Sequence, residues 1–89
     1  MIQQAITISN KLGLHARASA KLTKLAGSFP CEVWVSRGSR RVNAKSIMGV
    51  MMLAAGIGTE ITLETSGERE QEAIQALVDL INDKFGEGE

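Results

Sequence analysis

In the first third of the chain, the spacing of apolar residues changes from that of a strand to that of a helix. Residues 2–8 alternate between apolar and polar side chains, with the isoleucines on one side, and this pattern predicts a strand. From Ala16 onward the spacing is that of a helix, and Gly27 provides a stop signal. The apolar stripe expected to face the core from this helix comprises Ala18, Leu22, Leu25, Ala26 and Phe29.

The middle of the chain returns to alternation. Residues 31–36 place an apolar side chain at every second position, which predicts a half-buried strand. Gly38 and Ser39 then form a turn into a short partner strand over residues 40–43. A fourth strand is expected over residues 60–65, where isoleucine and leucine alternate with glutamate and threonine.

The last helix is predicted from its start signals and its stripe. Ser66 is a preferred N-cap residue, and Glu68 and Glu70 would give the first turn an acidic character that suits the helix dipole. The stripe comprises Ile74, Leu77, Val78, Ile81 and Phe85. Gly86 is expected to end this helix, and the tail over residues 87–89 is expected to fray.

These segments, with a short helix over residues 47–55, give the order βαββαβα. Alternating strands indicate a sheet with one solvated face, so the helices must cover the other face. We therefore predict an α+β sandwich of two layers, formed by all 89 residues as a single domain. Trp34 should lie on the open face of the sheet.

Charge is distributed unevenly, although the formal net charge is zero. Residues 1–59 hold eight basic residues and one acid, whereas residues 60–89 hold two basic residues and nine acids, so the halves carry +7 and −7. This asymmetry favours an acidic partner for the first half. Alternatively, the two halves pair with each other within the fold.

The composition also excludes several classes of function. The single histidine and the lone Cys31 cannot form a zinc site or an internal disulfide, so we expect no metal and no cofactor. The chain lacks a glycine-rich phosphate loop, and the absence of tyrosine argues against an RNA-binding sheet. There is no apolar run long enough to span a membrane and no signal peptide, so a cytoplasmic location is expected.

His15 stands where a loop becomes the first helix. The helix N-terminus offers unpaired N–H groups and the positive end of the dipole, which favour the neutral, nucleophilic imidazole and also suit a bound anion. Arg17 would add a guanidinium for phosphate oxygens. These features taken alone fit a solvated surface histidine near a helix start better than a functional one.

Ser46 opens the second helix, over residues 47–55, which Gly56 closes. Serine is a preferred N-cap, and a phosphoserine would also be favoured at a helix start. This helix is apolar on all sides, so we expect Val50 and Leu53 to face the core. The side chains expected to remain outside as a docking surface are Ile47, Met48 and Met51. The alternative is a helix sunk beneath the other two.

Two segments resemble the HPr family, the histidine phosphocarriers of the bacterial phosphotransferase system. Residues 11–17 (KLGLHAR) resemble its active-site segment, and residues 43–51 (NAKSIMGVM) its regulatory-serine segment. The resemblance implies an open-faced β-sandwich of four antiparallel strands under three helices. It also implies that His15 accepts phosphate on Nδ1 from phosphorylated enzyme I and passes it to a IIA-type acceptor, with Arg17 contacting the phosphate.

The same resemblance assigns further roles. Ser46 would be the target of an HPr kinase/phosphorylase. The residues that would meet partners are Ala16, Ala20, Lys24, Ile47, Met48 and Met51. The family implies a monomer that binds no nucleic acid and does not insert into a membrane.

One departure from the family pattern leaves open whether the chain belongs to the sugar-uptake or the nitrogen-related branch of the family. Many members have proline where this chain has Ala18, and the nitrogen-related branch often lacks that proline. The Ser46 segment points instead towards kinase-regulated members. Three readings follow: a carrier for sugar uptake, a carrier in a regulatory nitrogen-type chain, or a non-catalytic regulator that acts through phosphorylated Ser46.

Overall fold

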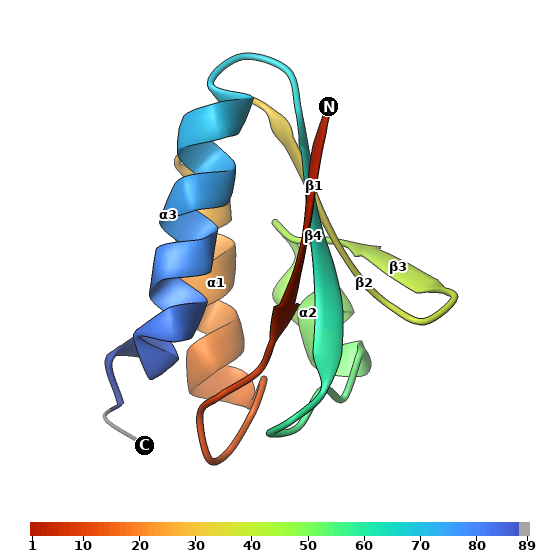
Figure 1. The fold of residues 1–89 in the computed structure, drawn as a ribbon, viewed down its shortest axis with the longest axis vertical. Helices are drawn as coiled ribbons and strands as arrows, with labels where there is room; N and C mark the ends of the chain where they lie inside the picture. The colour runs from red at the N-terminus through yellow and green to blue at the C-terminus, as the bar shows by residue number, and fades with distance from the viewer. Residues whose placement is uncertain (88–89) are drawn as a thin grey trace.

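The computed structural model describes residues 1–87, which form a four-stranded antiparallel sheet (Figure 1). The strands lie in the order β1-β4-β2-β3, so the first and last strands of the chain are neighbours. Their bounds are Ile2–Thr7 for β1, Glu32–Arg37 for β2, Arg40–Asn43 for β3 and Glu60–Ser66 for β4. Each predicted strand is present, with its ends shifted by at most one residue.

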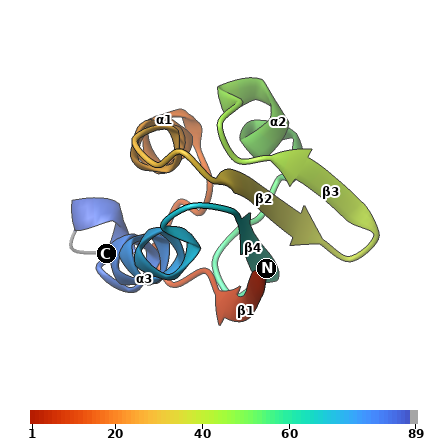
Figure 2. The same cartoon turned by 90° about the horizontal axis from the view of Figure 1, so that it is seen from above.

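The helices lie on one face of this sheet and leave the other face open (Figure 2). They are α1 (Ala16–Gly27), α2 (Ile47–Met52) and α3 (Glu70–Asn82), followed by a 3₁₀ turn, η1 (Lys84–Gly86). Helix α3 packs on β1 and β4, α2 lies beside β3, and α1 contacts both other helices. The predicted α+β open-faced sandwich with the order βαββαβα is confirmed.

The core lies between the sheet and the helices. Val33, Val35, Ile61 and Leu63 on the inner face of the sheet are at most 1% exposed, which confirms the alternation predicted for β2 and β4. The helices contribute Ala18, Leu22, Ala26, Ile74, Leu77 and Ile81, all buried. A fully buried aliphatic side chain contributes about 1.5–3 kcal/mol, so packing of these stripes holds α1 and α3 in place.

Trp34 lies half-buried on the open face, as expected. The guanidinium of Arg41 lies 4.1 Å from the centre of its ring and also pairs with Glu64 at 2.6 Å. Arg41 and Glu64 come from the basic and acidic halves of the chain, so the halves do pair within the fold at this point. This contact is compatible with an acidic partner elsewhere on the first half.

Helix α2 is shorter than predicted. It ends at Met52 instead of Ala55, because Ala54 adopts left-handed backbone (φ 51°) directly after the C-cap residue Leu53. The carbonyl groups freed at this end accept hydrogen bonds from two arginines of the β2–β3 hairpin. Arg37 Nη1 donates to the carbonyls of Leu53 and Ala54 at 2.9 and 3.0 Å, and Arg40 Nη1 donates to that of Met52 at 2.6 Å.

The start of α3 also differs from the prediction. Ser66 is the last residue of β4 and caps nothing, and Glu68 precedes the helix. The N-cap position is held by Arg69 in left-handed backbone (φ 64°), without a side-chain cap. The carboxylate of Glu70 instead reaches back to the turn before the helix, where it accepts the N–H of Gly67 at 2.9 Å. The acidic first turn therefore exists, but it begins at Glu70.

The C-terminal end of the described chain is a turn instead of a continued helix. Phe85 is buried, as predicted, but it lies in η1 with left-handed backbone (φ 55°), beyond the end of α3 at Asn82. Glu87 is held by hydrogen bonds to Asn10 and His15, so the prediction that it frays was wrong. The predicted fraying of residues 88–89 lies outside the described residues.

Helix α1 ends as predicted at Gly27, with Ser28 as its C-cap. Phe29, placed in its stripe from the sequence, lies beyond the helix but still packs on the core. Across residues 1–87, none of the helices has the length and apolarity needed to cross a membrane.

Candidate functional site

His15 is the N-cap residue of the 12-residue helix α1. Its backbone is extended (φ −76°, ψ −179°), and the N–H of Arg17 donates to its Nδ1 at 3.3 Å. Histidine is not among the usual capping residues, so one ring nitrogen performs a task that serine or aspartate normally performs. Nδ1 therefore faces the unpaired N–H groups and the positive end of the helix dipole.

The loop before His15 is locked against the loop that follows α2. Gly13 has left-handed backbone (φ +65°), and a Cβ there would lie 2.4 Å from the carbonyl oxygen of Ala55, so this position admits only glycine. The N–H of Leu14 donates to the same carbonyl at 2.9 Å. Inside the loop, Asn10 Nδ2 donates to the carbonyl of Gly13 at 2.8 Å. These bonds fix the backbone that presents His15.

The second ring nitrogen of His15 meets a carboxylate from the far end of the chain. His15 Nε2 lies 2.7 Å from Glu87 Oε2, and Asn10 Nδ2 donates to Glu87 Oε1 at 3.1 Å. The two side chains of the pair are 26% and 15% exposed. Burial raises the pKa of Glu87, but the hydrogen bonds from Asn10 and His15 outweigh it and hold the pKa below its usual 4.5.

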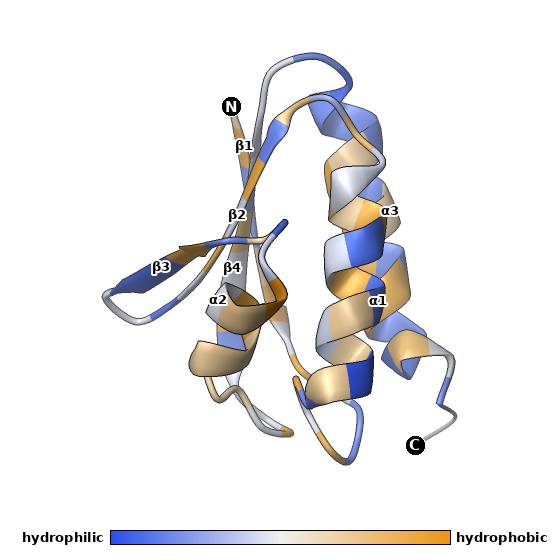
Figure 3. Ribbon diagram, turned by 180° about the vertical axis from the view of Figure 1, so that it is seen from behind, coloured by the Kyte–Doolittle hydropathy of each residue, from blue (hydrophilic) through white to orange (hydrophobic). Residues whose placement is uncertain are grey.

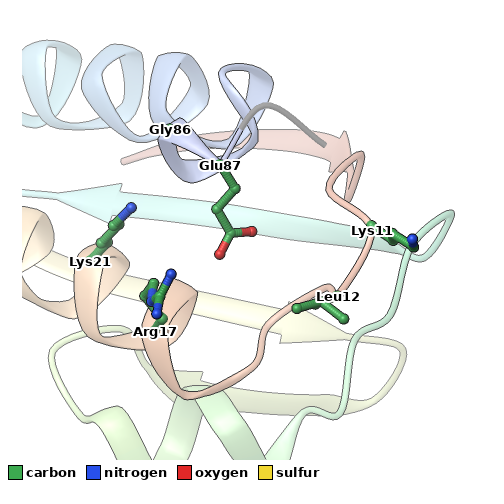
Figure 4. Close-up of a pocket in the computed structure, with 6 residues that line it drawn as sticks. All are labelled: Lys11, Leu12, Arg17, Lys21, Gly86 and Glu87. Carbon is green, nitrogen blue, oxygen red and sulfur yellow. The ribbon is translucent and has the colours of Figure 1, made fainter.

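A basic pocket opens beside this pair. Its volume is about 380 Å³, and Figure 4 shows the residues that line it: Lys11, Leu12, Arg17, Lys21, Gly86 and Glu87. Glu87 points from the C-terminal turn towards the start of α1, so its carboxylate enters a space bordered by cationic side chains (Figure 4). Lys21 Nζ also donates to the carbonyl of Phe85 at 2.5 Å. Such a pocket suits an anion.

Ser46 is the N-cap residue of α2, as the sequence predicted. Its Oγ accepts the N–H of Gly49 at 3.2 Å, and the residue is exposed. Helix α2 is apolar along most of its length (Figure 3). Val50 and Leu53 are buried, and the apolar side chains left at the surface are Ile47 (43% exposed), Met48 (70%), Met51 (38%) and Met52 (62%). The alternative of a sunken helix is wrong, since this surface is open.

The predicted contact residues of α1 fall on one line of that helix. Ala16, Ala20 and Lys24 are all exposed and four residues apart, and α1 lies against α2. The structure places His15 at the start of α1 and packs α1 against α2, while Lys24 also borders a groove with Leu80 of α3. We call His15, this row of α1 and the exposed apolar side chains of α2 the docking face.

Sequence reasoning missed three residues, one of which contacts His15 and two of which lie on loops near it. Leu12 and Ile57 are exposed apolar side chains (68% and 61%) on the two loops that Gly13 and Ala55 join. The available signal was one large apolar side chain in each loop, Leu12 after Lys11 and Ile57 between two glycines. Glu87 had no signal, because its role depends on a contact across 72 positions.

The fold and site define a class: a small α+β protein with a histidine at a helix start beside an exposed apolar helix. The family model described as the PTS HPr component phosphorylation site matches residues 2–83. The phosphocarrier protein HPr of Cupriavidus necator is 67% identical over 89 residues, covering 100% of both chains. The chain therefore belongs to the HPr family, and it is a phosphocarrier of the phosphotransferase system, not a catalyst by itself.

Solved structures agree with this assignment. The crystal structure of HPr from Thermoanaerobacter tengcongensis matches with a TM-score of 0.95 at 48% identity, covering 98% of each chain. A second structure from that organism, described as an HPr dimer, matches with a TM-score of 0.79 and covers 98% of this chain and 100% of that one. The similarity extends to the phosphocarrier protein NPr of Shewanella violacea. It is 41% identical and covers 97% of this chain and 94% of its own length.

Proposed function

We propose that His15 accepts a phosphoryl group on Nδ1 from phosphorylated enzyme I and passes it to a IIA-type acceptor in sugar uptake. The observation that carries this proposal is the position of Nδ1 at the N-terminus of α1, 3.3 Å from the N–H of Arg17. A phosphoryl group on Nδ1 would meet the unpaired N–H groups of the first turn. The guanidinium of Arg17, which borders the basic pocket, would contact its oxygens.

The strength of these contacts suits a carrier. An interaction with a helix end contributes about 0.3–2 kcal/mol. That is enough to orient a phosphoryl group and too little to trap it. Because the group must leave for a second partner, weak and oriented contacts serve the task better than an enclosed site. No cofactor or metal enters this scheme, since the histidine itself is the carrier.

Partners would bind at the docking face. Its centre is apolar, formed by Ile47, Met48 and Met51 of α2, and its edge carries the cationic Lys24 of α1. Adaptable methionine side chains suit a surface that must fit both enzyme I and a IIA-type acceptor. The basic character of the first half implies partners that are acidic around an apolar patch. Ala16 and Ala20 are small and allow close approach to His15.

Ser46 would regulate docking. It is exposed at the start of α2 and adjacent to Ile47 and Met48, so a phosphate there would place about two negative charges at the centre of the docking face. An HPr kinase/phosphorylase would be the enzyme that adds and removes it. The helix itself would be favoured by the charge, because Ser46 already caps it.

A second question is whether the chain serves sugar uptake or a regulatory nitrogen-type chain. The sugar-uptake reading is favoured by the higher identity to a protein named HPr (67%) than to one named NPr (41%). A carrier in a regulatory nitrogen-type chain is the second candidate, supported by Ala18 in place of the usual proline. A regulator acting only through phosphorylated Ser46 would have no need of His15. We also propose that the chain forms one cytoplasmic domain over residues 1–89 and acts as a monomer, although solved structures of two relatives are described as dimers.

The test is incubation with phosphoenolpyruvate and enzyme I. The parent chain should acquire one acid-labile phosphoryl group, and His15→Ala should acquire none while remaining folded, with a lower melting temperature because the cap of α1 is lost. Arg17→Ala should be labelled more slowly, because Arg17 assists the transfer without forming a bond. Labelling that survives in His15→Ala would overturn the proposal.

A further inference from the structure

The closest side-chain contact of His15 lies outside both family motifs. Glu87 follows η1 near the end of the chain, and its Oε2 lies 2.7 Å from His15 Nε2. The carboxylate is largely enclosed, with 15% of the side chain exposed. A chance contact on an open surface would leave both groups in water, so this enclosure needs an explanation.

The backbone conformation just before Glu87 directs its side chain towards His15. Lys84, Phe85 and Gly86 all have left-handed backbone, with φ of 53°, 55° and 74°. This conformation is unfavourable for residues with a Cβ, so Lys84 and Phe85 keep it only where other contacts hold them, whereas Gly86 adopts it readily. The buried ring of Phe85 anchors the turn in the core, and Lys21 Nζ binds its carbonyl at 2.5 Å.

A second residue fixes the carboxylate itself. Asn10 is fully buried, and its Nδ2 donates both to Glu87 Oε1 at 3.1 Å and to the carbonyl of Gly13 in the loop before His15. Asn10 therefore ties Glu87 to the same loop that presents the imidazole. Because both carboxylate oxygens are engaged, the direction of Glu87 towards Nε2 is set.

These contacts specify one neutral form of the ring. Nδ1 accepts the N–H of Arg17, so in a neutral imidazole the proton must be on Nε2, where it is donated to Glu87. A carboxylate paired with one ring nitrogen holds the imidazole in that tautomer and stabilises the imidazolium. The lone pair is then on Nδ1, at the helix N-terminus.

We propose that Glu87 is a positioning residue that selects Nδ1 of His15 as the nitrogen that is phosphorylated, and that it stabilises the phosphorylated ring. This inference rests on the proposed function. In the step, the Nδ1 lone pair forms the N–P bond while the bond from phosphorus to the group on enzyme I breaks, and that electron pair stays with enzyme I. The ring becomes a cation with Nε2–H facing the Glu87 carboxylate, so no proton has to move. Transfer to the acceptor returns the electron pair to Nδ1.

The tautomer can be measured directly in the unphosphorylated chain. We would compare the parent with Glu87→Gln, Glu87→Ala and the control Glu68→Gln, an exposed glutamate before α3. Two-bond ¹H–¹⁵N spectra of the imidazole are recorded at a pH where the ring is neutral. The parent and the control should show Nε2–H almost alone, and both Glu87 variants should show a mixture with Nδ1–H. The melting temperatures establish that each variant is folded.

The rate of phosphorylation by enzyme I is the second readout. Loss of a charged hydrogen-bond partner should slow it about tenfold in both Glu87 variants and leave Glu68→Gln unchanged. Unchanged tautomers together with unchanged rates in the folded Glu87 variants would overturn the inference. A changed rate with an unchanged tautomer would overturn the selection of Nδ1. If enzyme I does not phosphorylate the parent, the proposed function fails, and the spectra still decide whether Glu87 sets the tautomer.

Discussion

The surroundings of His15 and the exposed face of α2 are built in opposite ways. His15 lies in a polar network in which a glycine, an asparagine and a distant carboxylate each fix one part of the geometry. The exposed face of α2, the apolar part of the docking face, carries adaptable methionine side chains and begins at the Ser46 cap. The contrast indicates that the atom transferred must be held in place, whereas the surface that meets several partners must adapt. Changes to the backbone of the loop that holds His15 should affect the fold and the chemistry together, whereas changes to the exposed side chains of α2 should affect binding alone.

The largest effect is expected at Gly13. Gly13→Ala would force left-handed backbone on a residue with a Cβ and bring that Cβ to 2.4 Å from the Ala55 carbonyl oxygen. Backbone strain of this kind costs about 1–3 kcal/mol, and the clash with backbone adds to it. Urea unfolding should show a loss at or above the top of that range, and the rate of phosphorylation should fall as the His15 loop shifts.

Gly38→Ala is the matched control for this change. Gly38 also has left-handed backbone (φ +60°), but nothing lies within 4 Å of an added Cβ. It should lose about 1–2 kcal/mol through backbone strain alone and keep its rate of phosphorylation. Equal losses of stability in the two variants would contradict the tight approach of the loops.

Ser46→Asp tests whether a negative charge beside the apolar side chains of α2 weakens docking. Aspartate caps a helix as well as serine does, so the melting temperature should stay the same or rise. The negative charge beside Ile47 and Met48 should repel an acidic partner and slow phosphorylation by enzyme I about tenfold, with a larger effect at low salt. A slower rate with a collapsed melting temperature would indicate damage to the fold.

Met48→Gln tests the same face without a charge. Met48 is 70% exposed, so the variant should unfold within about 0.5 kcal/mol of the parent. Affinity for enzyme I, measured by calorimetry, should fall severalfold because a polar amide replaces an apolar contact.

Val50→Ala is the contrasting variant for Met48→Gln. Val50 is buried in the same helix, and this change should cost about 2 kcal/mol of stability. Equal affinities of Met48→Gln and the parent would remove Met48 from the interface.

The smallest effect is expected on the open face of the sheet, away from both regions. Hydrogen bonds from Arg41 and Gln3 lower the pKa of Glu64 from its usual 4.5. A lowered pKa in the folded state means that Glu64 adds stability above pH 4.5 and that this contribution is lost as the pH falls through the folded value. Glu64→Gln should therefore reduce the dependence of unfolding free energy on pH between neutral and acidic conditions. An identical pH profile would contradict the pairing.

A feature of this structure could be predicted from the sequence when it depends on residues that are close together in the chain. The strands, the exposed face of α2 and the positions of His15 and Ser46 at helix starts follow from patterns within a few residues. The cap of α3 was misassigned because Ser66 is a good cap by residue type, yet β4 extends through it and α3 begins after Arg69 without a side-chain cap. Glu87 could not be predicted, since its position depends on left-handed residues and on Asn10 at the other end of the chain. Phe85 was correctly predicted as buried, but in the wrong element.

The central claim is that phosphate is carried on one nitrogen of one residue. The most direct measurement is ¹⁵N–³¹P coupling in the ¹⁵N-labelled chain after phosphorylation by enzyme I and phosphoenolpyruvate. A coupling between phosphorus and Nδ1 of His15, with Nε2 still protonated and facing Glu87, is the predicted result. Coupling to Nε2, or phosphate on another residue, would contradict the account.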